Sequence, residues 1–407
     1  MGVPACYSTR RPGSHHATAA AILLFIIRAF WIRAENLDPS LQVQVTLWVP
    51  NSRGDDYFDH PPLDSSEVRS VCNGQKWDSN TNTEVVFTCD NSVGEIVDTR
   101  NSILNCVRYA IPAGGSLVMP RIIVRKGSGK GKHVGYTFDA DHFIKSLRLS
   151  CPLLRLYDDV EEKIPSTGIQ HPNRWRGQLY DWLGQVQTDV SPTGRPNYGG
   201  HILKFRPDAR ELATKALLQM AKISGSKLTQ PEGDAAPSKP GTYAGTIPEN
   251  AYLGIYLQEG KDSEETRTLF AETKQTADYL EQAVDAGLSL VYIANGDATQ
   301  VKSLKSEAKA KSITVVTKQD FLGNKNGLEN LQRDQQALVD FLVLLSASHF
   351  SGAACSSFSW NVALKRHLLV QSPRRKHWDG PQTFKNRPNH LHGEPESCPE
   401  FFACLWP

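Results

Sequence analysis

The second half of this 407-residue chain alternates segments typical of strands with segments typical of helices. Short apolar strand patterns lie at 252–257, 288–294 and 313–317, and helical patterns at 264–286 and 299–310 separate them. Strands that alternate with helices pair in parallel, and such sheets bind ligands at the carboxyl ends of their strands. The alternation therefore predicts an α/β fold with its binding site at that edge.

The stretch 337–367 closes this series. It opens with an apolar run at 338–345, interrupted by Asp340, which its composition assigns to a strand buried on both faces. A turn of small residues follows at 346–357, and a helical pattern then runs from Phe358 to Arg366. Strand, small-residue turn and helix is a geometry that presents backbone N–H groups to a phosphate. An ordinary strand–loop–helix unit is the alternative interpretation.

The first half shows a less regular mixture of strand and helix patterns. The expected elements are strands at 41–49, 84–88, 117–119 and 122–124 and helices at 102–110, 141–149 and 209–223. The segment 225–246, rich in Pro, Gly, Ser and Lys, is typical of a linker or long loop. We therefore expect an N-terminal domain at 36–235 and a C-terminal domain at 246–371.

Both ends of the chain differ from these domains. In the segment 1–35, Arg10 and Arg11 precede an apolar run at 19–32, which indicates a secretory signal peptide or a signal-anchor. The pattern predicts the secretory pathway, in the endoplasmic reticulum or Golgi, with membrane anchoring left open; a core helix is the alternative. The segment 372–407 has no periodicity, which predicts a disordered tail.

The eight cysteines include no CxxC pair, which argues against a zinc ribbon. The histidines and cysteines of the tail fit no familiar ligand spacing either, so no metal site is expected. Cys72 and Cys89 bracket a polar loop, and a disulfide between them is plausible in an oxidising compartment. Cys106, Cys151 and Cys355 have apolar surroundings, which favours buried free thiols.

Three blocks of sequence stand in a characteristic order. They are TRNSILNCVRYAIPAGGSLVMPR at 99–121, FDADHFIKSLRLSCPLLRLY at 138–157, and Ser356-Ser357-Phe358 followed by WNVALKRH at 360–367. Together they resemble the GDP-fucose protein O-fucosyltransferase-like family, especially its fungal members. The resemblance implies a GT-B-like α/β architecture of two Rossmann-like domains facing a cleft, with 36–235 on the acceptor side and 246–371 binding the nucleotide sugar. It also implies transfer of fucose from GDP-fucose to a protein or glycan hydroxyl, without a metal or other cofactor.

The resemblance also names candidate catalytic positions after the first strand of the second domain. The family has a His-x-Arg-x-x-x-Asp pattern there, whose arginine lies by the diphosphate. In this sequence Tyr256 stands at the His position, Gln258 at the Arg position, and Asp262 matches. A neutral glutamine makes a weaker hydrogen bond to phosphate than a cation does. The chain is therefore either a weak or inactive relative, or Lys261 compensates; a solvated loop lysine is the alternative for Lys261.

Further candidate positions would bind the donor nucleotide. Ser356, Ser357 and Phe358 match the turn that supplies backbone donors in the family. Arg100 and Asn101 match the loop and helix start that approach donor and acceptor; an ordinary helix-start arginine is the alternative for Arg100. Asp297 follows a predicted strand and is placed to meet a ribose or base edge, or else to form a turn.

Three classes of function are compatible with these patterns. The first is a fucosyltransferase-like enzyme, the second a non-catalytic relative that binds a nucleotide sugar or glycan, and the third a cytosolic nucleotide-binding α/β enzyme. A nucleic-acid binder is disfavoured, because the formal charge is +2 and the basic residues are scattered outside the tail. Acceptor choice is expected to depend on variable loops, mainly 166–198.

Overall fold

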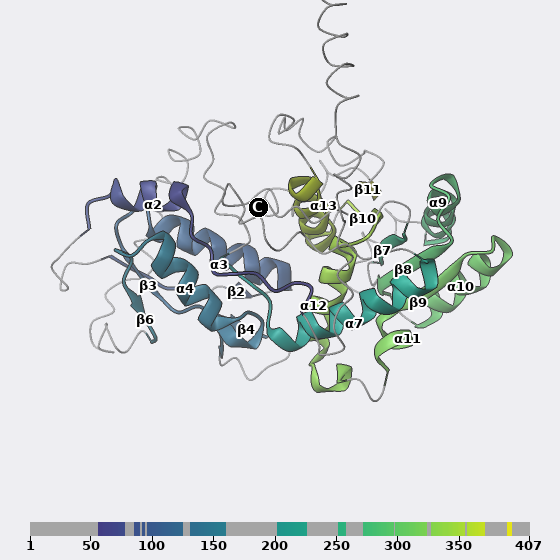
Figure 1. Ribbon diagram of the computed structural model, residues 1–407, viewed down its shortest axis with the longest axis horizontal. Helices are drawn as coiled ribbons and strands as arrows, with labels where there is room; N and C mark the ends of the chain where they lie inside the picture. Colours follow the sequence, from purple (N-terminus) through teal and green to yellow (C-terminus); the bar gives the residue numbers. More distant parts are fainter. Residues whose placement is uncertain are drawn as a thin grey trace, which may run out of the picture. The chain divides into compact units, whose positions relative to one another are not determined.

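Figure 1 shows a computed structural model of the chain. The structure describes residues 56–77, 85–89, 92–93, 96–124, 131–159, 202–225, 251–257, 272–296, 298–323, 327–354, 356–370 and 389–392. The predicted signal segment at 1–35, the strand at 41–49, the loop at 166–198 and nearly all of the predicted linker lie outside these residues. Within them, no helix combines the length and the apolar character needed to cross a bilayer.

A five-stranded parallel sheet is the largest element of the fold. Its strands are β7 (Leu253–Leu257), β8 (Leu290–Asn295), β9 (Thr314–Thr317), β10 (His349–Ala353) and β11 (Asn389–His392), in the spatial order β11-β10-β7-β8-β9. The three strands expected from the alternating pattern coincide with β7, β8 and β9. The prediction of a mixed α/β fold with a parallel sheet is therefore confirmed.

Side chains of this sheet alternate between two apolar clusters, as the two-residue period of a strand requires. On one face, Leu253, Ile255 and Val291 pack with α9 (Glu272–Asp285) and α10 (Ala298–Ala310). On the other face, alternate residues of β7 and β8 belong to the cluster that includes α12, which packs directly on both strands. A sheet covered on both faces accounts for strands that are apolar throughout.

The apolar run at 338–345 was predicted to be a strand, and this prediction is wrong. It forms the second half of helix α12 (Arg333–Leu345), which begins with a capping box formed by Gln332 and Gln335. The hydrophobic periodicity did not reveal this helix, because α12 is buried on nearly all sides between the sheet and helices α3 and α7. A helix in that position is apolar on every side. Asp340 lies in this interior, where it accepts a hydrogen bond of 2.7 Å from Tyr292 Oη and pairs with Lys318.

Strand β10 instead occupies the part of the sequence that was predicted to be a turn. Strand β10 follows α12 in the chain. The neighbouring strand β7 has a glycine, Gly254, where α12 packs on the sheet. A Cβ atom there would lie 2.8 Å from Leu344 Cδ2. The glycine thus lets the helix pack closely on the centre of the sheet.

Part of the tail is ordered, contrary to the expectation for 372–407. Residues Asn389–His392 form β11, which pairs in parallel with β10. His392 Nε2 lies 2.8 Å from Ser351 Oγ, and its ring makes edge contact with Tyr279. Within the described residues no group of three or more His, Cys, Asp and Glu side chains is arranged to hold a metal ion.

Helix α13 (Ser357–Val370) is anchored against the sheet by Arg366, a fully buried residue. The guanidinium group donates to Asn389 Oδ1 at 2.8 Å and to carbonyl oxygens where α12 ends and β10 approaches. These carbonyls belong to Leu344, Leu345, Ala347 and Ser348. Arg366 therefore satisfies the terminal carbonyls of α12 and links them to β11.

The segment before residue 160 contains two three-stranded sheets, ordered β1-β3-β6 and β2-β4-β5. The strands are β1 (Val86–Phe87), β2 (Ser92–Val93), β3 (Ser116–Val118), β4 (Arg121–Ile123), β5 (Lys132–His133) and β6 (Leu156–Tyr157), and a short 3-10 helix, η1 (Val134–Tyr136), follows β5. The helices are α2 (Ser66–Asn73), α3 (Ile96–Ala110) and α4 (Ala140–Ser150). The strands predicted around 84–88, 117–119 and 122–124 and the helices at 102–110 and 141–149 are all present.

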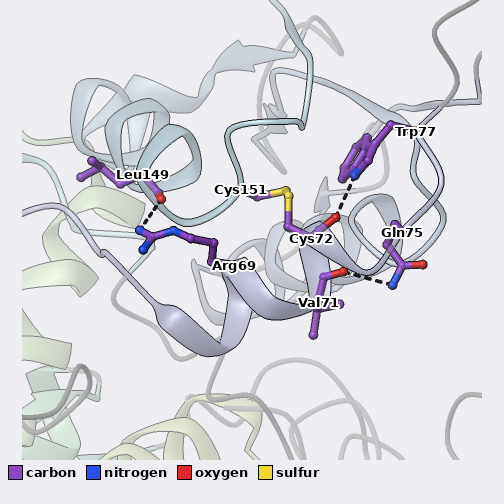
Figure 2. The surroundings of a disulfide bond; sticks show 7 residues. All are labelled: Arg69, Val71, Cys72, Gln75, Trp77, Leu149 and Cys151. Atoms are coloured by element: carbon purple, nitrogen blue, oxygen red, sulfur yellow. Dashed lines mark hydrogen bonds between the residues drawn. A yellow bond between two sulfur atoms is a disulfide. The ribbon is translucent and has the colours of Figure 1, made fainter.

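Two disulfides stabilise this segment, and they differ from the predicted pairing of Cys72 with Cys89. Cys72 of α2 is bonded to Cys151, directly after α4, and Cys89 is bonded to Cys106 of α3. Figure 2 shows the first bond, flanked by hydrogen bonds from Arg69 to Leu149 O and from Trp77 to Cys72 O. The prediction of free thiols at Cys106 and Cys151 is also wrong. Cys355 lies outside the described residues.

The remaining described helices are α7 (Pro207–Ser224), α11 (Lys318–Leu322) and a short 3-10 turn, η2 (Leu328–Asn330). Helix α7 confirms the helix predicted at 209–223, and it packs against α12 and α11. The Phe205 ring before α7 makes edge contact with Phe341 of α12, at a centroid distance of 5.5 Å. The division into domains at 36–235 and 246–371 stays a prediction.

Candidate functional site

The strand order of the large sheet marks where a ligand would bind. The chain runs from β7 to β8 and β9 on one side, and then returns to β10 and β11 on the other. Adjacent connections therefore leave the sheet in opposite directions between β7 and β10. In open α/β sheets, ligands bind in the crevice that this reversal creates outside the carboxyl ends of the strands. The candidate site residues are therefore those that follow β7 and β10.

Ser356 and Ser357 follow β10 and start α13. Ser356 is buried, and its Oγ accepts a hydrogen bond of 3.3 Å from the Ser359 N–H, three residues on. This is the contact of a helix N-cap, so the Ser356 hydroxyl has a structural role. Ser357 is the first residue of a 14-residue helix whose positive end lies on the carboxyl side of β10. Backbone N–H groups at such a helix start favour anions.

Phe358 is a packing residue. Its ring stacks on Tyr256 at the end of β7, with a centroid distance of 4.3 Å and an interplanar angle of 14°. It also makes edge contact with Phe341 of α12, at 5.4 Å. The side chain is buried, so its contribution is to fix the start of α13 beside the end of β7.

Asn295 ties the ends of β7 and β8 together. Its Nδ2 donates to Leu257 O at 2.9 Å and lies 3.5 Å from Tyr256 Oη. Its backbone has a φ of 60°, in the left-handed region that asparagine tolerates better than most residues, and Gly296 follows with a φ of 86°. This contact fixes the last residue of β7, immediately before Gln258.

Arg100 and Asn101 lie on α3, and they come close to α13. Arg100 Nη1 donates to Asn361 Oδ1 at 3.3 Å and to Asn101 Oδ1 at 3.4 Å. Both residues are buried, with Arg100 4% exposed, and burial lowers the pKa of its guanidinium to about 10. Among the residues that the structure describes, no carboxylate pairs with Arg100. The structure thus brings together Arg100, Asn101 and helix α13.

Lys365 belongs to the same surroundings and was missed by the sequence interpretation. It lies on α13 one turn beyond Asn361, on the same side of the helix. Burial, followed by the charge of Arg100, lowers the pKa of its amine to about 7. The four-residue spacing from Asn361 in the WNVALKRH block was the available signal.

The other predicted site residues lie outside the described part of the chain. These are Gln258, Lys261, Asp262 and Asp297. Their predicted positions follow β7 and β8 at the carboxyl edge, and their roles stay predictions.

No protein-family model and no curated relative matches the chain. Among solved structures, it is similar to POFUT1 in complex with GDP, with 13% identity, a TM-score of 0.41, and coverage of 73% of this chain and 98% of that chain. POFUT1 in complex with GDP-fucose has 12% identity, a TM-score of 0.41 and the same coverage. A point mutant of Arabidopsis thaliana FUT1 in complex with GDP has 11% identity and a TM-score of 0.38, over 77% of this chain and 79% of that one.

Proposed function

We propose that the chain is a fucosyltransferase-like glycosyltransferase, related to the fungal-type members of that family. It uses GDP-fucose as donor and transfers fucose to a hydroxyl group of a protein or glycan acceptor. The observation that carries the proposal is Arg100, a buried cation without a described carboxylate partner, hydrogen-bonded to the helix that starts at the carboxyl edge of the sheet. The identity of the donor rests on the resemblance of the three sequence blocks.

A buried guanidinium group without a counter-charge carries a desolvation cost, which an anionic ligand would offset. Arginine presents a planar set of donors that matches phosphate oxygens in pairs. The start of α13 adds backbone donors and the positive end of a helix dipole. These groups suit a nucleoside diphosphate better than a neutral ligand.

In the proposed reaction, the acceptor oxygen attacks the anomeric carbon of fucose. The bond from that carbon to the β-phosphate oxygen breaks, GDP leaves, and the acceptor hydroxyl loses its proton. Negative charge develops on the leaving diphosphate, so fixed cations and N–H donors beside it stabilise the transition state. Arg100, the N-terminal N–H groups of α13 and the residues after β7 would supply this charge, and the family resemblance implies that no metal takes part.

GDP binding tests the site. GDP should raise the melting temperature of the full chain, because a ligand that binds the native state stabilises it. Arg100→Gln should reduce the affinity at least about tenfold, as expected when a charged hydrogen-bond donor is lost. The control is Arg121→Gln, a half-exposed arginine that pairs with Asp159 and should leave binding unchanged. Equal GDP affinity in the parent and Arg100→Gln proteins would remove Arg100 from the site.

Turnover of GDP-fucose separates the enzyme from the alternative, a non-catalytic relative that binds a nucleotide sugar or glycan. Gln258→Arg should increase hydrolysis or transfer at least about tenfold, a modest part of what one transition-state donor supplies. The single variant is preferred to a double change with Tyr256→His, because the Tyr256 ring stacks on Phe358. Parent turnover as fast as that of the variant would show that Gln258 is no defect and direct attention to Lys261. GDP binding without turnover in either protein would favour the alternative.

We also propose that the protein works in the secretory pathway, in the endoplasmic reticulum or Golgi, and that residues 19–32 are its means of entry or anchoring. The disulfides Cys72–Cys151 and Cys89–Cys106 support an oxidising compartment. Mass spectrometry of non-reduced peptides from cells tests this. Four free thiols together with a cytosolic location would refute it.

A further inference from the structure

Lys365 and Arg100 form a pair of cations whose environment is unusual for a folded protein. Arg100 reaches α13 through Asn361, and Lys365 follows Asn361 by one turn of the same helix. Arg100 is buried and Lys365 is partly buried, and each lacks a carboxylate partner in the part of the chain that the structure describes. Two like charges held together in this way repel each other, so one of them is favoured to lose its proton.

The amine is the group that can do so. Arginine stays protonated in proteins, whereas lysine changes its pKa readily when it is buried. Burial, together with the charge of Arg100, lowers the pKa of the Lys365 amine to about 7. With the site empty, Lys365 is therefore largely neutral above neutral pH.

Neighbouring charged groups on the elements packed around α13 are engaged elsewhere. Arg366, next along the helix, points to the carbonyls at the end of α12. Asp340 of α12 bonds Tyr292 and Lys318. His392 of β11 contacts Ser351. Asp98 of α3 is about 200° around that helix from Arg100.

We infer that Lys365 is the second cation of the diphosphate site and that it takes up a proton when the anion binds. The inference rests on the proposed function, which places the diphosphate beside Arg100. An anion next to the amine favours its charged form, so the pKa of Lys365 rises in the complex. Binding and protonation are then linked: the anion binds with a proton drawn from solvent, and the positive charge of the site matches the ligand that occupies it.

Isothermal titration calorimetry of the full chain measures this proton directly, through the dependence of the binding heat on the ionisation heat of the buffer. GDP and inorganic diphosphate are the two probes. At pH 8 a free amine with a pKa of about 7 is about one-tenth protonated, so close to one proton should be taken up on binding. At pH 6 the amine is already protonated and the terminal phosphate of GDP is about half protonated, so the uptake should vanish and a fraction of a proton should be released instead. The terminal phosphate of GDP is almost fully ionised at pH 8, so the proton count is read from GDP. Inorganic diphosphate still carries a proton at that pH, which nearby cations displace, so it serves as a probe of binding alone.

Two variants of Lys365 distinguish the effect of its positive charge from the effect of its change in protonation. Lys365→Arg keeps a charge at every pH tested, so it should bind GDP with little or no proton uptake. Lys365→Gln removes the charge and should weaken GDP at least about tenfold. The control is Lys305→Arg on α10, where an exposed lysine pairs with Asp320, and uptake should match the parent. Melting temperatures establish that each variant is folded.

The outcomes distinguish this inference from the proposed function. GDP binding without proton uptake at pH 8 would overturn the inference and leave the nucleotide site in place. Uptake that persists in Lys365→Arg would also overturn it, because another group would then be the proton acceptor. Binding of inorganic diphosphate that Lys365→Gln weakens, but no binding of GDP, would support the cation pair and refute the nucleotide assignment. Binding of neither probe would overturn both.

Discussion

The segment from α2 to β6 and the five-stranded sheet are stabilised by different means. The first has strands of two or three residues in two small sheets, and two disulfides link its helices and loops. The second has strands of four to six residues, buried on both faces, and its described part is stabilised by packing and by buried polar groups such as Arg366. Small sheets bury too little apolar area to be stable alone, so covalent links add to the packing there. The proposed site draws Arg100 from the first segment and α13 from the second.

The largest effect expected from this comparison comes from the disulfide Cys72–Cys151. It closes a loop of 79 residues, against 17 for Cys89–Cys106. In the chain-entropy account, these loops correspond to about 4.5 and about 3 kcal/mol of stability. Cys72→Ala/Cys151→Ala should therefore lower the free energy of unfolding more than Cys89→Ala/Cys106→Ala does. Guanidinium denaturation under oxidising conditions measures both.

Hydrogen exchange measures the loss of protection separately in the two regions. Loss of the Cys72–Cys151 bond should expose amides of α2 and α4 while those of β7, β8 and β10 stay protected. Equal loss of protection in both regions would show that the two segments unfold as one unit, and the contrast between them would not hold.

The next largest loss of stability is expected in the five-stranded sheet, when Arg366 is replaced. Arg366→Gln should lower the free energy of unfolding by about 2–3 kcal/mol, because the carbonyls at the end of α12 lose their buried donor. Arg100→Gln is the control: it removes another buried arginine, which within the described residues donates to two asparagine side chains and to no helix-terminal carbonyl, and should change stability by less than about 1 kcal/mol. Chemical denaturation of the two variants decides the point, and similar losses would mean that Arg100 also has a structural role.

The smallest effect concerns pH and β11. Burial, with a further contribution from His390, lowers the pKa of His392 to about 4. The unfolded chain, with a pKa of about 6.5, binds the proton more tightly, so stability falls as pH drops below about 6.5 and levels off near 4. After discounting for partial exposure, we expect a loss of about 1 kcal/mol between pH 7 and 5. His392→Gln should flatten that part of the denaturation profile, and an unchanged slope would exclude His392 as its source.

Local sequence patterns predicted most of the described fold. Helix α3 was recognisable from apolar positions on one face, closed by Gly114 and Gly115, and β7 and β8 from short apolar runs between helices. The run at 338–345 failed because an apolar stretch of eight residues is compatible with a buried strand or a buried helix. What decides between them is the packing of α12 against elements far away in the sequence, which no local pattern contains.

The disulfides and the site show the same limit. Cys72 lies 17 residues from Cys89 but bonds to Cys151, 79 residues away, because α2 packs against α4. Arg100 was identified from the resemblance, whereas Lys365 was missed because its significance depends on a neighbour from another part of the chain. The sequence supplied candidate residues for the carboxyl edge, and the tertiary contacts bring Arg100 beside helix α13.

Strand β11 has a consequence for self-association. Its four residues cover the hydrogen-bonding edge of β10, which is buried and apolar along most of its length. If this cover is lost, by proteolysis after Val370 or by a mutation that releases β11, β10 becomes an open edge strand. Unpaired strands of this kind pair readily with other chains and promote aggregation. Because β11 is itself the edge strand of the described sheet, the protection that it gives against such pairing comes from its short length and its polar Asn and His residues.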